Sequence, residues 1–164
     1  MKPEEASNRI EASLVRLRVC QPFFGALALF IDYYIDDSIS TACTNGKWIR
    51  FNPEFVCSIT AKELDGVVIH ELLHAALRHS SRRGSRAPML WNVAADIVVN
   101  GIIREVSGIE LPFQPVENRL LRDFEVEEVY KQLGNSSEIR LLPAEWHDLT
   151  FDEVGQCAGG GPTG

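Results

Sequence analysis

Apolar and polar positions in the first part of the chain predict an amphipathic helix followed by short strands. Between residues 4 and 20, Ile10, Leu14 and Leu17 recur at helical spacing, with Glu and Arg residues on the opposite side. The next stretch, residues 23–31, is almost entirely apolar but much shorter than the roughly 20 residues that a membrane span needs. We therefore expect a packing helix and then a buried strand.

A hairpin is predicted after this strand. Two short runs of β-prone residues, 39–42 and 47–51, flank Asn45 and Gly46. The Asn-Gly pair suits the tight turn between two antiparallel strands. The second run, residues 47–51, also offers an edge to which an extended peptide could add.

Two longer helical patterns follow the hairpin. Thr60 and Glu63 have the spacing of a capping box, and the apolar residues after them predict a helix over about residues 61–80. A basic segment, residues 82–88, interrupts this pattern, and a further helix is expected over about residues 88–106. A short basic loop therefore joins the two long helices.

The patterning weakens towards the C-terminus. Asp123 is a candidate cap for a short helix over residues 124–133, which Gly134 would end. Residues 156–164 are rich in glycine and cannot bury apolar surface, so we interpret them as a flexible tail or a linker to further protein. Residues 1–155 are expected to form a single domain.

The predicted elements define an α+β fold that is mainly helical. The chain has 164 residues, of which 45% are hydrophobic, and this is enough for one compact core. Its net charge of −7 repels phosphates, so a nucleic-acid partner is not expected. The four cysteines form no Cys-x-x-Cys pair, and the N-terminus has no secretory pattern. We therefore expect a cytoplasmic protein that makes no contact with a membrane.

Candidate chemistry is concentrated in the run His70-Glu71-Leu72-Leu73-His74, inside the helix expected over residues 61–80. Positions four apart project from one face of a helix, so His70 and His74 are suited to bind one zinc ion. Glu71 is offset by about 100° around the helix, where a carboxylate can take a proton from an activated water. The spacing thus assigns each of the three polar residues a distinct task.

Catalytic zinc usually takes three protein ligands, and the candidates for the third are His79, Asp96 and His147. In an unbroken helix His79 points away from the metal, so we interpret it as a surface or interhelical histidine. Asp96 lies mid-helix in a polar stripe with Asn92 and Asn100, each four residues away. If this stripe faces the two histidines of the helix, Asp96 becomes the third ligand and the two amides hold the ligands in place.

The order of HELLHAALRH, a basic loop and WNVAADIVVN resembles a bacterial metallopeptidase domain family that often precedes a von Willebrand A-like domain. The likeness covers most of residues 4–133. It implies a zincin-like fold with a small β-hairpin or sheet beside the HExxH helix. It also implies that zinc binds to His70, His74 and Asp96 and that Glu71 is the general base.

The function that we predict is zinc-dependent hydrolysis of a peptide bond, in which Glu71 accepts the proton of the attacking water and returns it to the leaving amine. Tyr130 and His147 are candidates to stabilise the oxyanion. The alternative is a non-catalytic module in which His79 or His147 closes the zinc site as a fourth ligand. Such a module would act with a partner, a von Willebrand A-like domain or an AAA+ ATPase. Hydrolysis of a non-peptide substrate by the same water is a third interpretation.

Overall fold

The computed structural model describes residues 2–135 and confirms an α+β fold that is mainly helical. The predictions for His147, for residues 156–164 and for the end of the 1–155 domain lie outside the described residues. No helix within residues 2–135 combines the length and the apolar character needed to cross a membrane.

The first helix, α1 (Lys2–Cys20), confirms the first amphipathic pattern. Its apolar stripe is buried, whereas its Glu residues face solvent. The buried Ser13 donates a hydrogen bond to Asp65 at 2.5 Å, and Arg16 binds the same carboxylate at 2.7 and 2.9 Å. These polar contacts connect α1 to the later helix that contains Asp65, α4 (Ala61–Ala76).

The buried strand expected over residues 23–31 is wrong. This segment forms a short helix, α2 (Pro22–Leu27), and a 3-10 turn, η1 (Ala28–Phe30). Proline is favoured in the first turn of a helix because its missing N–H has no partner there. Gly25 allows α2 to approach α1 closely, because a Cβ at this position would lie 2.6 Å from the Cα atom of Arg18.

Three short strands form one mixed sheet in the order β1-β3-β2. The antiparallel strands β2 (Ala42–Thr44) and β3 (Trp48–Phe51) confirm a hairpin around Asn45 and Gly46, although β2 lies later than the expected residues 39–42. Strand β1 (Asp32–Ile35) pairs parallel to β3. Strand β3 is therefore central. The prediction that residues 47–51 offer a free edge is wrong, because both sides of β3 are occupied by other strands.

The hairpin turn has the local chemistry that its sequence suggests. Gly46 adopts a positive φ of 93°, a conformation that glycine takes without steric cost. The side-chain oxygen of Asn45 accepts hydrogen bonds from the backbone amides of Lys47 and Trp48 at 2.9 and 3.1 Å. The turn therefore determines the register of β2 and β3.

Side-chain caps begin the next two helices, α3 (Pro53–Ser58) and α4 (Ala61–Ala76). Asn52 accepts a hydrogen bond from the amide three residues ahead at 2.9 Å. Thr60 and Glu63 make both hydrogen bonds of the predicted capping box at the start of α4.

Helix α4 ends earlier than the predicted residue 80. Arg78 has φ 58° and ψ 35°, which is the left-handed conformation, and the chain changes direction there. The short helix α5 (His79–Arg82) follows. Residues other than glycine rarely adopt this conformation, so the sequence carries no signal for the break.

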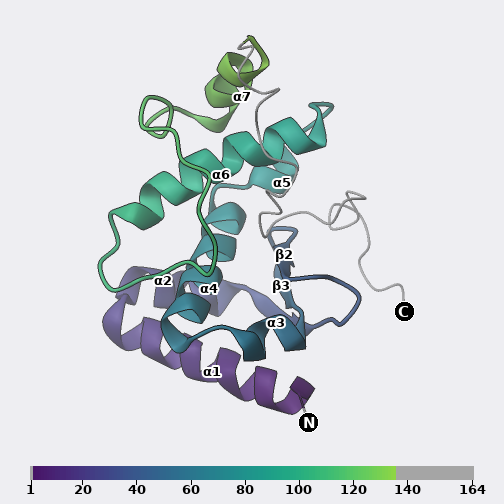
Figure 1. Ribbon diagram of the computed structural model, residues 1–164, viewed down its shortest axis with the longest axis vertical. Helices are drawn as coiled ribbons and strands as arrows, with labels where there is room; N and C mark the ends of the chain where they lie inside the picture. The colour runs from purple at the N-terminus through teal and green to yellow at the C-terminus, as the bar shows by residue number, and fades with distance from the viewer. Residues whose placement is uncertain (1, 136–164) are drawn as a thin grey trace.

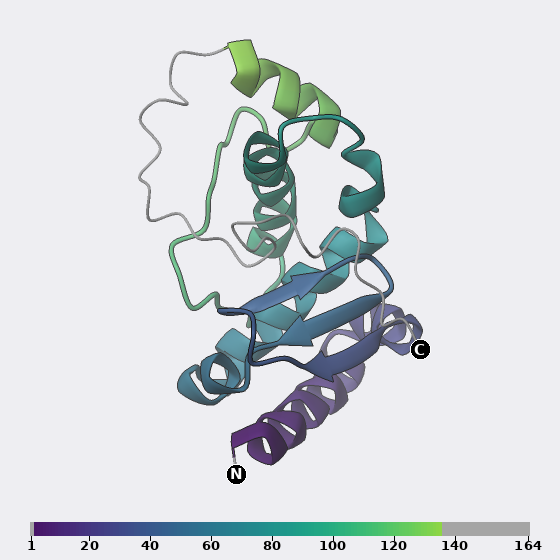
Figure 2. The same cartoon turned by 90° about the vertical axis from the view of Figure 1, so that its right-hand side faces the viewer.

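The two remaining helices are α6 (Pro88–Arg104) and α7 (Val126–Asn135). Both confirm predicted helices, although α7 begins two residues after the expected residue 124 and continues through Gly134. Helix α6 crosses above α4, and α7 packs on the other side of α6 (Figure 1). The sheet lies across α1 and α4 (Figure 2).

The interior is divided into two clusters of buried side chains. The larger one, core 1, joins α1, α2, the sheet, α3, α4 and the second half of α6. Core 1 consists of Ala6, Ile10, Leu17, Phe24, Ala28, Ala42, Ile49, Phe51, Val56, Leu64, Val67, Val68, Ile69, Leu72, Leu73, Val99 and Ile103. The smaller one, core 2, joins the first half of α6 to α7 and to the segment between them. Core 2 consists of Trp91, Ala94, Ala95, Ile97, Val116, Leu121, Val126 and Val129.

Candidate metal centre

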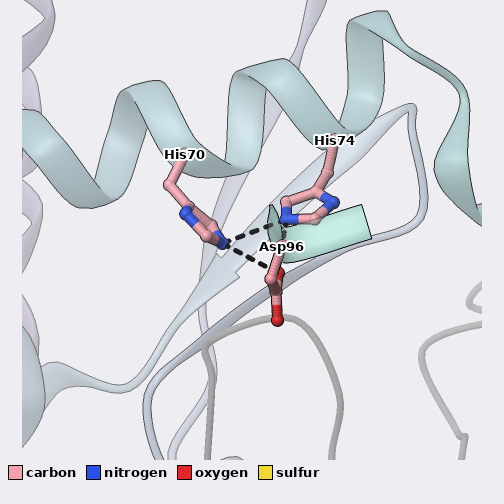
Figure 3. Close-up of side chains that lie close together, drawn as sticks. All are labelled: His70, His74 and Asp96. Carbon is pink, nitrogen blue, oxygen red and sulfur yellow. Dashed lines mark hydrogen bonds and ion pairs between the residues drawn. The ribbon is translucent and has the colours of Figure 1, made fainter. Parts of the chain in front are cut away.

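Helix α4 presents His70 and His74 on one face, one turn apart. Their exposed fractions are 0% and 2%, so both rings are inside the molecule. The Nε2 atoms of the two rings lie 3.0 Å apart, and both rings point away from the helix towards the same place (Figure 3). The four-residue spacing therefore places both histidines on the same side of the helix, as helix periodicity predicts.

Asp96 reaches the same place from α6. Its Oδ1 atom lies 3.5 Å from His70 Nε2 and 3.1 Å from His74 Nε2, and its exposed fraction is 1% (Figure 3). The donor atoms of these three residues all lie within 4.8 Å of one another. Among residues 2–135, His70, His74 and Asp96 thus form a buried candidate metal site that joins α4 to α6.

The donor set fits a zinc ion. Bonds of about 2.0–2.1 Å in a tetrahedral arrangement place neighbouring ligand atoms roughly 3.3 Å apart. The three separations of 3.0, 3.1 and 3.5 Å lie around this value. Two imidazoles and one carboxylate are also among the donor sets that catalytic zinc takes. The arrangement suits one small divalent cation.

Glu71 follows His70 on α4, and its exposed fraction is 0%. Burying a carboxylate costs free energy because the charged form loses its hydration, and pairing or hydrogen bonding offsets this cost. Its neighbours in the sequence, His70 and Leu72, are equally buried, so this whole turn of α4 lies inside the molecule. The helix therefore places an acidic group one residue from a candidate ligand, in a region with little solvent.

His79 lies next to His74, in a position that the sequence did not predict. The prediction of an unbroken helix, in which His79 points away, is wrong because the left-handed Arg78 returns the chain towards α4. His79 Nδ1 lies 3.0 Å from His74 Nδ1, which is the ring nitrogen that does not face Asp96. His79 thus contacts the outer side of a candidate ligand.

Several contacts hold His79 in this position. The Trp91 indole N–H donates a hydrogen bond to the His79 carbonyl oxygen at 2.8 Å. Burial is the main cause that lowers the pKa of His79 from 6.5 to about 2, and electrostatic interactions with His74 and Arg82 contribute to the same shift. The His79 ring is therefore neutral at ordinary pH.

Arg82 connects the short helix α5 to α7. Its guanidinium donates to Glu127 at 2.9 and 2.6 Å and to Glu125 at 2.9 Å. Hydrogen bonding from Arg82 lowers the pKa of Glu127 from its usual 4.5. These ion pairs link α5 to the beginning of α7.

The two amides of the predicted polar stripe occupy different surroundings. Asn100 is buried, and its side-chain N–H donates to the Val116 carbonyl oxygen at 3.1 Å. Asn92 is half-buried. Among the described residues, neither side-chain oxygen accepts a hydrogen bond. Their expected role of holding the ligands stays a prediction, while Asn100 demonstrably connects α6 to the segment that leads to α7.

Tyr130, a candidate to stabilise an oxyanion, packs against core 2 and is not among the three candidate ligands. Its hydroxyl accepts a hydrogen bond from the Ala87 amide at 3.1 Å, and its ring lies against Trp91 with the centroids 6.0 Å apart. The other candidate, His147, lies outside the described residues. The structure thus shows a packing and capping contact for Tyr130.

Comparison with known proteins identifies the family. A family model described as "Putative metallopeptidase domain" matches residues 5–157. No curated protein and no solved structure matches the chain. The matched range includes the histidine pair of α4 and the aspartate of α6, and it confirms the resemblance seen in the sequence. The chain belongs to the family described as "Putative metallopeptidase domain".

Proposed function

We propose that this protein is a zinc peptidase of the HExxH type with a zincin-like fold. The observation that carries the proposal is the convergence of His70, His74 and Asp96 beside a buried Glu71. Three protein ligands leave a coordination position for water, as catalytic zinc sites do. When bound there, zinc would acidify that water and polarise the carbonyl group of the scissile bond.

Glu71 is the proposed general base. Its carboxylate accepts a proton as the water attacks the peptide carbonyl, and it delivers this proton to the nitrogen of the leaving amine. A base of this kind works best where water is scarce, and the exposed fraction of 0% for Glu71 supports this role. His70 and His74 remain neutral donors throughout, and Asp96 contributes the negative charge of the donor set.

Strand β2 is the proposed binding edge for a peptide. It is an outer strand of the sheet, and it packs beside α4, which carries both histidines. An extended substrate can add to such an edge through main-chain hydrogen bonds. We therefore infer a protein or peptide substrate, and we retain a von Willebrand A-like domain or an AAA+ ATPase as a proposed partner.

The non-catalytic alternative needs a closed site with four protein ligands. Of the two residues proposed to close it, His79 contacts the Nδ1 side of His74 rather than the Nε2 side, which faces the other candidate ligands. His79 is thus in the wrong place to serve as the fourth ligand. This observation favours the enzyme over a zinc-stabilised interaction module.

The test is Glu71→Gln, which keeps the shape of the side chain and removes the base. We expect unchanged zinc content and a loss of peptide cleavage of about 10²–10⁴-fold, the usual contribution of a general base. Zinc content would be measured by elemental analysis, and cleavage by mass spectrometry of a peptide library. Glu63→Gln at the start of the same helix is the matched control, and it should cleave at nearly the wild-type rate. Full activity in Glu71→Gln would exclude this mechanism, and a zinc-loaded wild-type protein that cleaves no peptide would favour the interaction module.

A further inference from the structure

His74 uses both of its ring nitrogens in contacts inside the molecule. Nε2 lies 3.0 Å from His70 Nε2 and 3.1 Å from Asp96 Oδ1, whereas Nδ1 lies 3.0 Å from His79 Nδ1. A neutral imidazole has one N–H donor and one acceptor nitrogen. If Nε2 uses its lone pair for a metal, the proton of His74 must be on Nδ1. The facing Nδ1 of His79 must then be an acceptor.

His79 is suited to this role because its own position is determined by several contacts. Its exposed fraction is 2%, and its carbonyl oxygen accepts the Trp91 N–H at 2.8 Å. The Trp91 ring meets the His79 ring edge to face, with centroids 6.4 Å apart and planes at 88°. The left-handed Arg78 gives the backbone the direction that brings His79 back to α4. A conformation of this kind persists only where the surrounding structure enforces it.

Metal-binding histidines usually donate their second N–H to a carboxylate, a carbonyl oxygen or water. Here the facing group is a neutral imidazole, which accepts a hydrogen bond without adding negative charge. The site already contains the carboxylate of Asp96, and the buried Glu71 directly follows His70 in α4. A neutral acceptor therefore orients the His74 ring and leaves the charge of the donor set unchanged.

We propose that His79 is a positioning residue of the metal centre: it accepts the Nδ1–H of His74 and so turns His74 Nε2 towards His70 and Asp96. This inference rests on the proposed zinc site, but not on peptide cleavage. It assigns His79 a task outside the donor set. It also explains why the chain leaves α4 through a left-handed residue, Arg78, four residues after the end of the HExxH motif.

The test compares two substitutions of nearly equal size. The side-chain oxygen of His79→Asn replaces the Nδ1 acceptor, whereas His79→Leu has the same branched shape without an acceptor. We expect the zinc dissociation constant, measured by competition with a chelator of known affinity, to rise about 10–100-fold in His79→Leu, the usual effect of losing such a partner. In His79→Asn it should stay within about threefold of the wild type. Equal zinc affinity in His79→Leu and the wild type would overturn the proposal.

A measurement on the wild-type protein makes the test independent of how well the variants fold. In the zinc-loaded full chain, nitrogen-15 NMR should show a proton on His74 Nδ1, none on His79 Nδ1, and a scalar coupling between these two nitrogens across the hydrogen bond. A proton on His79 Nδ1, or a metal bound to the His79 ring, would contradict the proposal. A wild-type chain that binds no zinc would refute the proposed function as well, whereas zinc binding without the coupling would refute only the role of His79.

Discussion

The two cores of this molecule are stabilised in different ways. Core 1 gathers mainly aliphatic side chains, together with Phe24 and Phe51, from the sheet and five helices, so no single residue dominates it. Core 2 depends on one large side chain, the fully buried Trp91, and on polar contacts at its rim. There Arg82 binds Glu125 and Glu127, and Arg86 stacks on Trp91 with its guanidinium carbon 5.1 Å from the ring centre.

The candidate ligands are divided between these two regions. His70 and His74 come from α4, which is packed inside core 1, whereas Asp96 comes from α6. Its neighbours Ala95 and Ile97 belong to core 2, and Val99 belongs to core 1. A metal ion at this site would join a helix of the larger core to a helix shared with the smaller one. Because core 2 has fewer buried side chains of its own, metal binding should stabilise core 2 more than core 1.

The largest expected effect is that of Trp91→Ala. Truncating the fully buried Trp91 removes the largest side chain of core 2 and should cost about 3–5 kcal/mol. Hydrogen exchange should show that α7 loses protection first while α1 keeps most of its protection. Leu72→Ala in core 1 is the comparison variant, and it should lower the hydrogen-exchange protection of α1 and α7 together. Equal losses in α1 and α7 for Trp91→Ala would mean that the two cores unfold as one.

Zinc removal should have the next largest effect. At a zinc concentration 100-fold above the dissociation constant, binding stabilises the folded state by about 2.7 kcal/mol. A chelator should therefore lower the melting temperature and increase hydrogen exchange in α6 and α7 more than in α1. Asp96→Ala should lose both the zinc and this stabilisation, whereas Asp123→Ala, at an exposed carboxylate, should keep them. Full zinc occupancy in Asp96→Ala would remove Asp96 from the donor set.

The smallest expected effects are those of two Gly→Ala substitutions, which should have opposite signs in the two regions. In Gly66→Ala of α4, the new Cβ would lie 1.9 Å from the Glu110 carbonyl oxygen, so backbone must move. We expect a loss of about 1–3 kcal/mol, typical of overpacking, although Ala favours helix more than Gly does. In Gly134→Ala of α7, the nearest atom is Leu90 Cδ2 at 3.7 Å, and a gain of a few tenths of a kcal/mol is expected. Urea unfolding would measure both changes, and a stabilised Gly66→Ala would show that Glu110 does not constrain α4.

Local signals predicted much of the fold. The Thr60/Glu63 capping box, the Asn45-Gly46 turn and the start of α6 at Pro88 all lie where the sequence places them. Each of these features depends on residues a few positions apart, so the sequence contains the information directly. The apolar run at residues 23–31 was misinterpreted because a short apolar run has no periodicity that separates a strand from a helix.

Two properties of the candidate site could not be predicted in this way. The contact between His79 and His74 depends on the left-handed Arg78, whose side chain gives no sign of this conformation. The central place of β3 depends on β1, which precedes the hairpin in the chain, pairs with β3 and leaves β2 as an outer strand beside α4. Both features depend on contacts between different segments of the chain, and the local sequence pattern does not contain these contacts.

The residues of the HExxH run and their common helical face follow from the sequence, because helix periodicity is a local property of the backbone. The sequence also contained Asp96 in a polar stripe, together with two histidines that competed with it for the same role. Only the tertiary structure placed Asp96 Oδ1 3.1 Å from His74 Nε2 and turned His79 to the opposite side of that ring. The physical reason is that the crossing of α4 and α6 is determined by the packing of two cores, which no single segment contains.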